Sequence, residues 1–156
     1  MVKKYGDLYQ DTRRALLATE DAADAGVLAR MLVCHYSGKS QADFLANREM
    51  YASEKIVTDV EEGLARLLKQ EPIAYILGQW EFYGLPLHVS PKVLIPRDDT
   101  CAVAALAIKQ GLFLEKAPRI LDLCTGSGCI GLAIASRLPD AKVTLADISK
   151  DALAIA

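Results

Sequence analysis

The chain has 156 residues, of which 52% are hydrophobic and 24% are charged. This composition excludes intrinsic disorder and allows one or two small domains to bury a core. Its 18 basic and 20 acidic residues give a net charge of −2. Residues 1–71 hold 10 basic and 12 acidic side chains, and residues 72–156 hold 8 and 8. Because neither half is basic, we expect no direct binding of nucleic acid.

Two further features exclude other classes of protein. The longest apolar runs are too short for a transmembrane helix, and Met1 leads into polar sequence rather than a signal peptide. No two cysteines form a CxxC pair or have metal-ligand spacing, and these cysteines are Cys34, Cys101, Cys124 and Cys129. We therefore expect a reduced, cytoplasmic protein with no membrane segment and no metal site.

Residues 1–71 predict a small bundle of four amphipathic helices. The second helix begins near Glu20 and stops at Gly38, Ser40 caps the third, and the fourth ends before Pro72. Helical spacing predicts which side chains face inward. They are Tyr5, Leu8, Tyr9, Thr12, Leu16 and Leu17 on the first helix, Val27, Leu28, Met31, Leu32 and His35 on the second, and Ile56, Val57, Val60, Leu64, Leu67 and Leu68 on the fourth.

Residues 72–97 differ in character from the helical part. One helical turn closed by Gly78 precedes two short apolar strands, residues 80–83 and 85–89, which predict a β-hairpin around Gly84. The acidic pair Asp98 and Asp99 then predicts the start of a helix that ends near Gly111.

The last segment predicts the opening of a doubly wound α/β sheet. Residues 119–123 predict a strand, residues 124–128 a glycine turn, residues 129–138 a helix and residues 142–147 a second strand. Ser149 caps a further helix. The expected fold class is therefore α/β: a small helical bundle, a hairpin linker and the start of a Rossmann-like domain.

The glycine turn has the spacing of a nucleotide-binding loop. Gly126, Gly128 and Gly131 form a GxGxxG pattern that follows a predicted strand and opens a helix. Asp147 ends the next strand about 20 residues further on, where a carboxylate can hydrogen-bond ribose hydroxyls.

The charge of Asp122 discriminates between two ligands. This residue lies at the carboxyl end of the first strand, directly before the turn. Its carboxylate would repel the pyrophosphate of NAD or FAD, which otherwise suits a helix N-terminus. It would attract S-adenosylmethionine, which carries a sulfonium and an ammonium group. The pattern favours the methyl donor, with a nicotinamide dinucleotide as the alternative.

Three segments carry a family resemblance. Residues 122–130 read DLCTGSGCI, residues 71–84 read EPIAYILGQWEFYG and residues 93–97 read VLIPR. The first resembles motif I of the class I methyltransferases. Together the three resemble the HemK-type protein-glutamine N-methyltransferases, and the similarity covers essentially the whole chain.

The resemblance implies a reaction, a cofactor and a partner. Members of this family transfer a methyl group from S-adenosyl-L-methionine to the glutamine side-chain amide in the Gly-Gly-Gln motif of peptide chain release factors. It implies that the helical domain and the hairpin help to dock this substrate. The expected cofactor-binding residues are Asp122, Cys124, Thr125, Gly126, Ser127, Gly128 and Asp147, and the expected substrate-side residues are Pro96 and Arg97.

The sequence departs from the family pattern at three places. Cys124 stands where motif I often has glycine, and Asp98 and Cys101 replace the usual proline and glutamate after Arg97. The chain ends at Ala156 without the Asn-Pro-Pro-Tyr motif that holds the acceptor amide in the family. We therefore expect the N-terminal part of a longer, monomeric enzyme, with no catalytic residue in this chain and no activity of the chain alone.

The expected domains are a substrate-recognition domain at residues 1–71, a linker at residues 72–97 and the first part of the methyltransferase domain at residues 98–156. Three other functions remain as alternatives: methylation of a large-subunit ribosomal protein, an NAD-dependent oxidoreductase, and a translation-factor binding module without chemistry.

Overall fold

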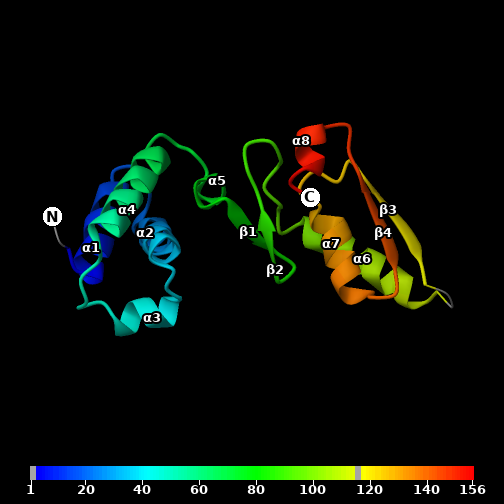
Figure 1. Ribbon diagram of the computed structural model, residues 1–156, viewed down its shortest axis with the longest axis horizontal. Helices are drawn as coiled ribbons and strands as arrows, with labels where there is room; N and C mark the ends of the chain where they lie inside the picture. Colours follow the sequence, from blue (N-terminus) through cyan, green and yellow to red (C-terminus); the bar gives the residue numbers. More distant parts are fainter. Residues whose placement is uncertain (1–2, 115–116) are drawn as a thin grey trace. The chain divides into compact units, whose positions relative to one another are not determined.

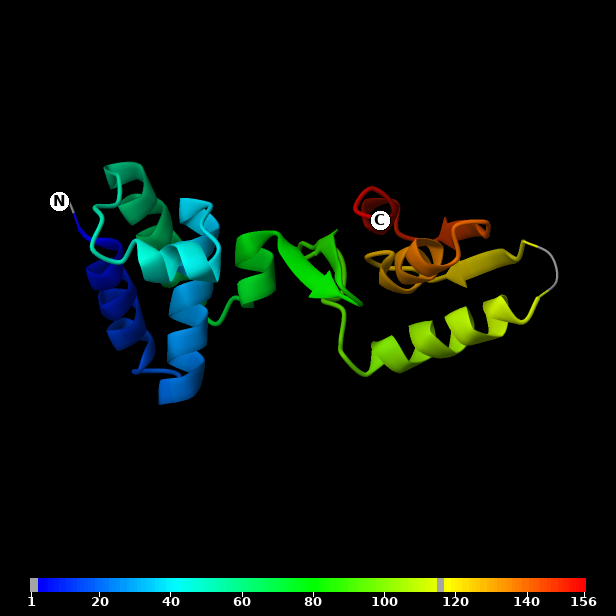
Figure 2. The same ribbon diagram turned by 90° about the horizontal axis from the view of Figure 1, so that it is seen from below.

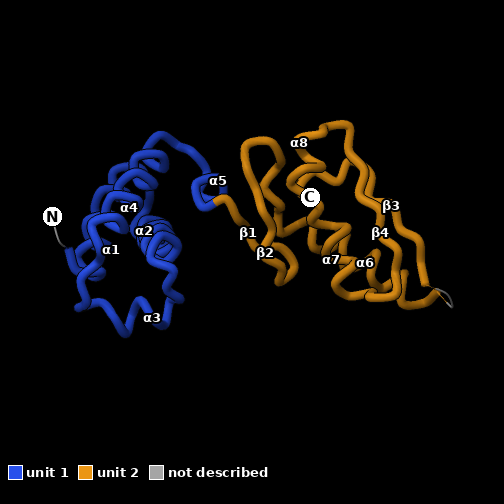
Figure 3. The backbone as a smooth tube through the Cα atoms, in the orientation of Figure 1, with its two compact units in different colours: residues 1–77 blue, residues 78–156 orange. Residues whose placement is uncertain are grey.

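The computed structural model describes residues 3–114 and 117–156, and Figures 1 and 2 show its elements from two sides. The chain divides into two compact units, residues 1–77 and residues 78–156 (Figure 3). None of the helices in the described part of the chain is long and apolar enough to cross a membrane.

The first unit is helical, and side-chain caps define where its helices begin. Asp21 accepts the N–H groups of Ala23 and Asp24, Ser40 and Asp43 form a capping box, and Ser53 accepts from Ile56. The helices are α1 (Tyr5–Leu16), α2 (Ala22–Ser37), α3 (Gln41–Ala46), α4 (Glu54–Leu67) and α5 (Ile73–Leu77). The predicted bundle of amphipathic helices is confirmed.

The core of this unit corrects the predicted inward face of α2. Leu32 is fully buried as expected, but Val27 is 45% exposed, whereas Ala25 and Ala29 are fully buried. The buried face of α2 therefore combines the small Ala25 and Ala29 with Leu32 and Val33, and a prediction that weighs only large apolar residues misses its alanines. The predicted inward faces of α1 and α4 are confirmed, except that Leu17 and Leu68 are exposed. These two residues lie just past the helix ends.

The second unit begins with the predicted β-hairpin. Strands β1 (Gln79–Phe82) and β2 (Leu85–His88) pair in antiparallel register. Tyr83 and Gly84 form the two-residue turn with φ of 54° and 78°, the pattern of a type I′ turn. Phe82 and Leu87 are buried in one cluster with residues of α6 and α7, so the hairpin forms part of the core of this unit.

A parallel strand pair carries the rest of the second unit. Strands β3 (Arg119–Leu123) and β4 (Lys142–Ala146) pair from Arg119↔Lys142 to Leu123↔Ala146. Helices α6 (Thr100–Leu112) and α7 (Cys129–Arg137) pack on the face that bears Ile120 and Val143, and α8 (Lys150–Leu153) follows β4. The predicted β-α-β order is confirmed, with the glycine turn at the carboxyl end of β3.

Candidate functional site

The turn between β3 and α7 has an unusual backbone. Cys124, Gly126 and Gly128 all have left-handed φ values, of 62°, 57° and 78°. Such residues reverse the chain within a few positions, and glycine adopts this conformation at little cost. Of the three, only Cys124 has a side chain, and that side chain is exposed. The sequence therefore has glycine at two of the three positions where the turn favours it.

Asp122 holds this turn in place through hydrogen bonds to its carboxylate. Its Oδ2 atom accepts hydrogen bonds from the Thr125 hydroxyl at 2.7 Å and from the Gly131 N–H at 2.9 Å. Gly128 is the N-cap of α7 and has no side chain to satisfy the first helical N–H groups. The Asp122 carboxylate satisfies one of them, that of Gly131, from the neighbouring strand. A Cβ on Gly131 would lie 3.0 Å from Asp122 Oδ2. The N-terminus of α7 thus already has an anionic partner.

Asp147 connects the glycine turn to the next loop. Its Oδ2 atom accepts the Gly126 N–H at 2.9 Å, and its Oδ1 atom accepts the Ser149 N–H at 2.9 Å. The N–H groups of Ser149 and then Gly126 lower the pKa of the Asp147 carboxyl below its usual value, because they stabilise the charged form. The two carboxylates predicted from the sequence therefore both bond to the turn, Asp122 from within β3 and Asp147 from directly after β4.

The seven predicted cofactor residues differ in exposure. Thr125 and Ser127 are buried, at 6% and 4% exposure, and the Ser127 side chain bonds to the Cys129 thiol, whose pKa is raised by burial. Their side chains therefore hold the turn in shape. Gly128 is buried, whereas Asp122, Gly126 and Asp147 are half-buried and Cys124 is exposed. The parts of the turn that face solvent are therefore Cys124 and, to a lesser extent, Gly126.

Pro96 and Arg97, the predicted substrate-side residues, lie between β2 and α6. Pro96 is buried and Arg97 is exposed. Lys92 Nζ lies 2.9 Å from Asp151 Oδ1, so this segment is tied to α8, which follows Asp147. Sequence reasoning missed this ion pair, since its partners stand far apart in the chain and neither belongs to a recognisable motif.

Ile148 is a second residue that sequence reasoning missed. It directly follows Asp147 and is 100% exposed. Its position after the end of β4 is a signal in the sequence, because an apolar residue there cannot pack against the strand pair. It offers an apolar surface beside the carboxylate that is expected to bind ribose.

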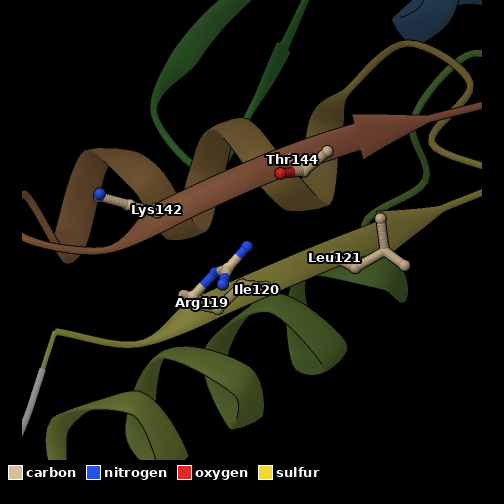
Figure 4. Close-up of a pocket in the computed structure, with 5 residues that line it drawn as sticks. All are labelled: Arg119, Ile120, Leu121, Lys142 and Thr144. Carbon is tan, nitrogen blue, oxygen red and sulfur yellow. The ribbon is translucent and has the colours of Figure 1, made fainter.

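A hollow on the strand pair lies away from these residues. Arg119, Ile120, Leu121, Lys142 and Thr144 line a space of about 570 Å³ along the first halves of β3 and β4 (Figure 4). Ligands of open α/β sheets bind at the carboxyl ends of the strands, where the glycine turn lies. Within residues 3–114 and 117–156, no three His, Cys, Asp or Glu side chains are placed to hold a metal ion.

The second unit has the features of a Rossmann-like domain: parallel strands, a glycine turn, and a carboxylate at the carboxyl end of each strand, with Asp122 within β3 and Asp147 directly after β4. Its sequence defines the class further. Residues 103–156 match the methyltransferase small domain, and residues 7–78 match the PrmC N-terminal domain. Each of the two segments is therefore similar to one of these families.

Curated relatives point to one kind of protein. The chain is 38% identical over 144 residues to the release factor glutamine methyltransferase of Bacteroides thetaiotaomicron, covering 92% of this chain and 51% of that protein. It is 47% identical over 114 residues to that of Haemophilus influenzae (70% and 39%) and 38% identical over 128 residues to that of Escherichia coli K12 (82% and 46%). The resemblance to the HemK-type methyltransferases is confirmed. The chain spans about half the length of the curated relatives it matches.

Proposed function

We propose that this chain supplies the cofactor site and a substrate-docking domain of a protein-glutamine N-methyltransferase that acts on peptide chain release factors. The observation that carries the proposal is the glycine turn braced by Asp122 and Asp147 in a chain similar to release factor glutamine methyltransferases along most of its length. The similarity supports the enzyme class, and the geometry supports the location of the cofactor.

The position of Asp122 favours S-adenosylmethionine over a dinucleotide. Its carboxylate bonds to the N-terminal turn of α7, the place where a pyrophosphate would otherwise bind. A doubly negative group would meet this carboxylate at short range, whereas a sulfonium cofactor would not be repelled. The carboxylate at the turn therefore counts against a pyrophosphate at the N-terminus of α7, and with it against the oxidoreductase alternative.

The residues present fit a nucleoside next to the turn. Each oxygen of the Asp147 carboxylate accepts one backbone N–H and retains acceptor capacity for a ribose hydroxyl. The exposed Ile148 offers an apolar contact for the base. S-adenosylmethionine bound there would supply the methyl group as an electrophile on sulfur. We assign no catalytic residue to this chain, since such a transfer depends mainly on the orientation of the acceptor amide.

The helical residues 1–71 form the substrate-docking domain in this proposal, residues 72–97 the linker and residues 98–156 the first part of the methyltransferase domain. Pro96 and Arg97 then lie on the substrate side, and Arg97 is exposed for such a contact. The supporting observations are the compact unit of helices, which extends to Leu77, and the match of residues 7–78 to the PrmC N-terminal domain.

Calorimetry on the full-length gene product tests the cofactor assignment. Asp147→Ala removes the proposed ribose ligand and should weaken S-adenosylmethionine binding on the order of tenfold or more. Asp140→Ala changes an exposed carboxylate before β4 and should leave the affinity unchanged. Equal affinity of Asp147→Ala and wild type would remove Asp147 from the site. Binding of NAD in place of S-adenosylmethionine would support the oxidoreductase alternative instead.

A further inference from the structure

We propose that Asp122 and Thr125 are positioning residues that hold the glycine turn in its ligand-binding shape before the cofactor arrives, and that neither side chain contacts the cofactor. This proposal rests on the proposed function. It gives Asp122 a different role from the one its charge alone suggests, because its carboxylate acts through the turn.

The hydrogen bonds at Thr125 carry this inference. The Thr125 hydroxyl donates to Asp122 Oδ2 at 2.7 Å, and its backbone N–H donates to the Ala146 carbonyl at 3.0 Å. Thr125 is only 6% exposed, so its hydroxyl lies in the interior of the unit. One side chain and one main-chain group thus fix the same residue to both strands.

Asp122 Oδ2 is shared between the turn and the helix. It accepts the Gly131 N–H at 2.9 Å as well as the Thr125 hydroxyl, so one oxygen atom joins the two sides of the turn. The residues that flank Thr125 in the sequence, Cys124 and Gly126, both have left-handed φ values. This backbone is unfavourable for a free loop, and the shared carboxylate oxygen compensates for it.

Loss of this bond should lower the fraction of molecules with a binding-competent turn. The apparent dissociation constant then rises by the inverse of that fraction, whichever ligand is used. A direct contact behaves differently. A carboxylate that touches the sulfonium or its surroundings would discriminate S-adenosylmethionine from S-adenosylhomocysteine, which has a neutral thioether in place of the sulfonium.

A double-mutant cycle separates the two roles. We would measure binding of both ligands by calorimetry in the full-length gene product with Thr125→Val, Asp122→Asn and the double variant. Each single change should weaken the binding of S-adenosylmethionine and of S-adenosylhomocysteine equally. The expected loss of affinity is on the order of tenfold for one charge-assisted hydrogen bond. The double variant should be no weaker than the weaker single variant, because Asp122→Asn removes the charge from the same bond that Thr125→Val removes altogether. Thr125→Ser keeps the hydroxyl and should restore wild-type affinity.

Two matched variants control for the chemical change itself. Thr144→Val removes a hydroxyl from the exposed face of β4, and Asp140→Asn neutralises an exposed carboxylate. Both should bind as wild type does. If Asp122→Asn fails to fold by circular dichroism, the comparison of Thr125→Val with Thr125→Ser decides the matter.

Three results would overturn the proposal. They are a loss in Asp122→Asn that is much larger for S-adenosylmethionine than for S-adenosylhomocysteine, additive losses in the double variant, or wild-type affinity in Thr125→Val. A wild-type protein that binds neither ligand would overturn the proposed function as well, so the two failures are distinguishable.

Discussion

Cys124 occupies a left-handed backbone position that side chains disfavour, with φ of 62°. This conformation costs an ordinary residue about 1–2 kcal/mol. Because the thiol is exposed, its removal loses little packing. After allowance for the greater unfolded-state entropy of glycine, Cys124→Gly should raise the free energy of unfolding by about 0.5–1 kcal/mol.

Urea unfolding of the two variants Cys124→Gly and Cys124→Ala measures this. The alanine variant keeps the strain and should match wild type. A less stable glycine variant would show that the Cys124 side chain packs against the turn.

The hydrogen bonds of Asp147 predict a specific pH dependence. Its lowered pKa means that the stability it contributes is present above the ordinary value of 3.8 and is lost as the pH falls through the lower folded-state value. Asp147→Asn lacks this titration. The gap between the unfolding midpoints of wild type and variant should therefore narrow as the pH falls from about 6 to about 3. A gap that stays constant over this range would mean that the charged carboxylate does not stabilise the turn.

At the scale of helices, replacing glycine by alanine should have opposite effects on stability at two positions, Gly63 and Gly26. A Cβ on Gly63 of α4 would lie 2.8 Å from Tyr36 Cε2 and 3.0 Å from Leu32 Cδ2, both on α2. A Cβ on Gly26 of α2 would find its nearest neighbour, the Tyr9 hydroxyl, at 3.5 Å, which is ordinary contact. Alanine favours a helix over glycine by about 1 kcal/mol, but overpacking costs about 1–3 kcal/mol.

Gly26→Ala should therefore raise the melting temperature, and Gly63→Ala should lower it. Thermal unfolding followed by circular dichroism measures both. An increase with Gly63→Ala would show that α2 and α4 can separate without cost.

The sequence predicted elements best where a local signal marks an end. Ser40 with Asp43, Gly38 and Ser149 each cap a helix as expected. The prediction was wrong for the inward face of α2, because helical periodicity gives weight to large apolar residues, whereas two alanines are buried on this face. It also placed the hairpin turn around Gly84 without Tyr83, since nothing in a tyrosine signals a φ of 54°.

The candidate site shows the same division. The glycine turn and the two carboxylates follow from spacing, because each stands at the end of a predicted strand. The bond from Gly131 to Asp122 and the pair of Lys92 with Asp151 depend on tertiary approach. No local pattern encodes such contacts.

For the molecule as a whole, the boundary between the units sets a prediction for fragments. The first unit extends to Leu77, and Ala74 and Ile76 of α5 are buried at 1% and 6% exposure. Ile76 packs in one cluster with Leu16 and Leu32. A fragment of residues 1–71 lacks these contacts and should be less stable than residues 1–77 by about 2–5 kcal/mol.

Urea unfolding of the two helical fragments checks this. Equal stability would mean that α5 adds nothing to the core. In either fragment, S-adenosylmethionine should shift no amide resonance, because the proposed cofactor site lies in the second unit. A shift would contradict that division of roles.

Transfer of a labelled methyl group from S-adenosylmethionine to purified release factor by the full-length gene product tests the central claim most directly. We expect the label on the glutamine of the Gly-Gly-Gln motif, located by mass spectrometry. We also expect a lower rate for Asp147→Ala at limiting cofactor and an unchanged rate for Asp140→Ala. Label on a large-subunit ribosomal protein alone, or no labelled glutamine above the background without enzyme, would contradict the account.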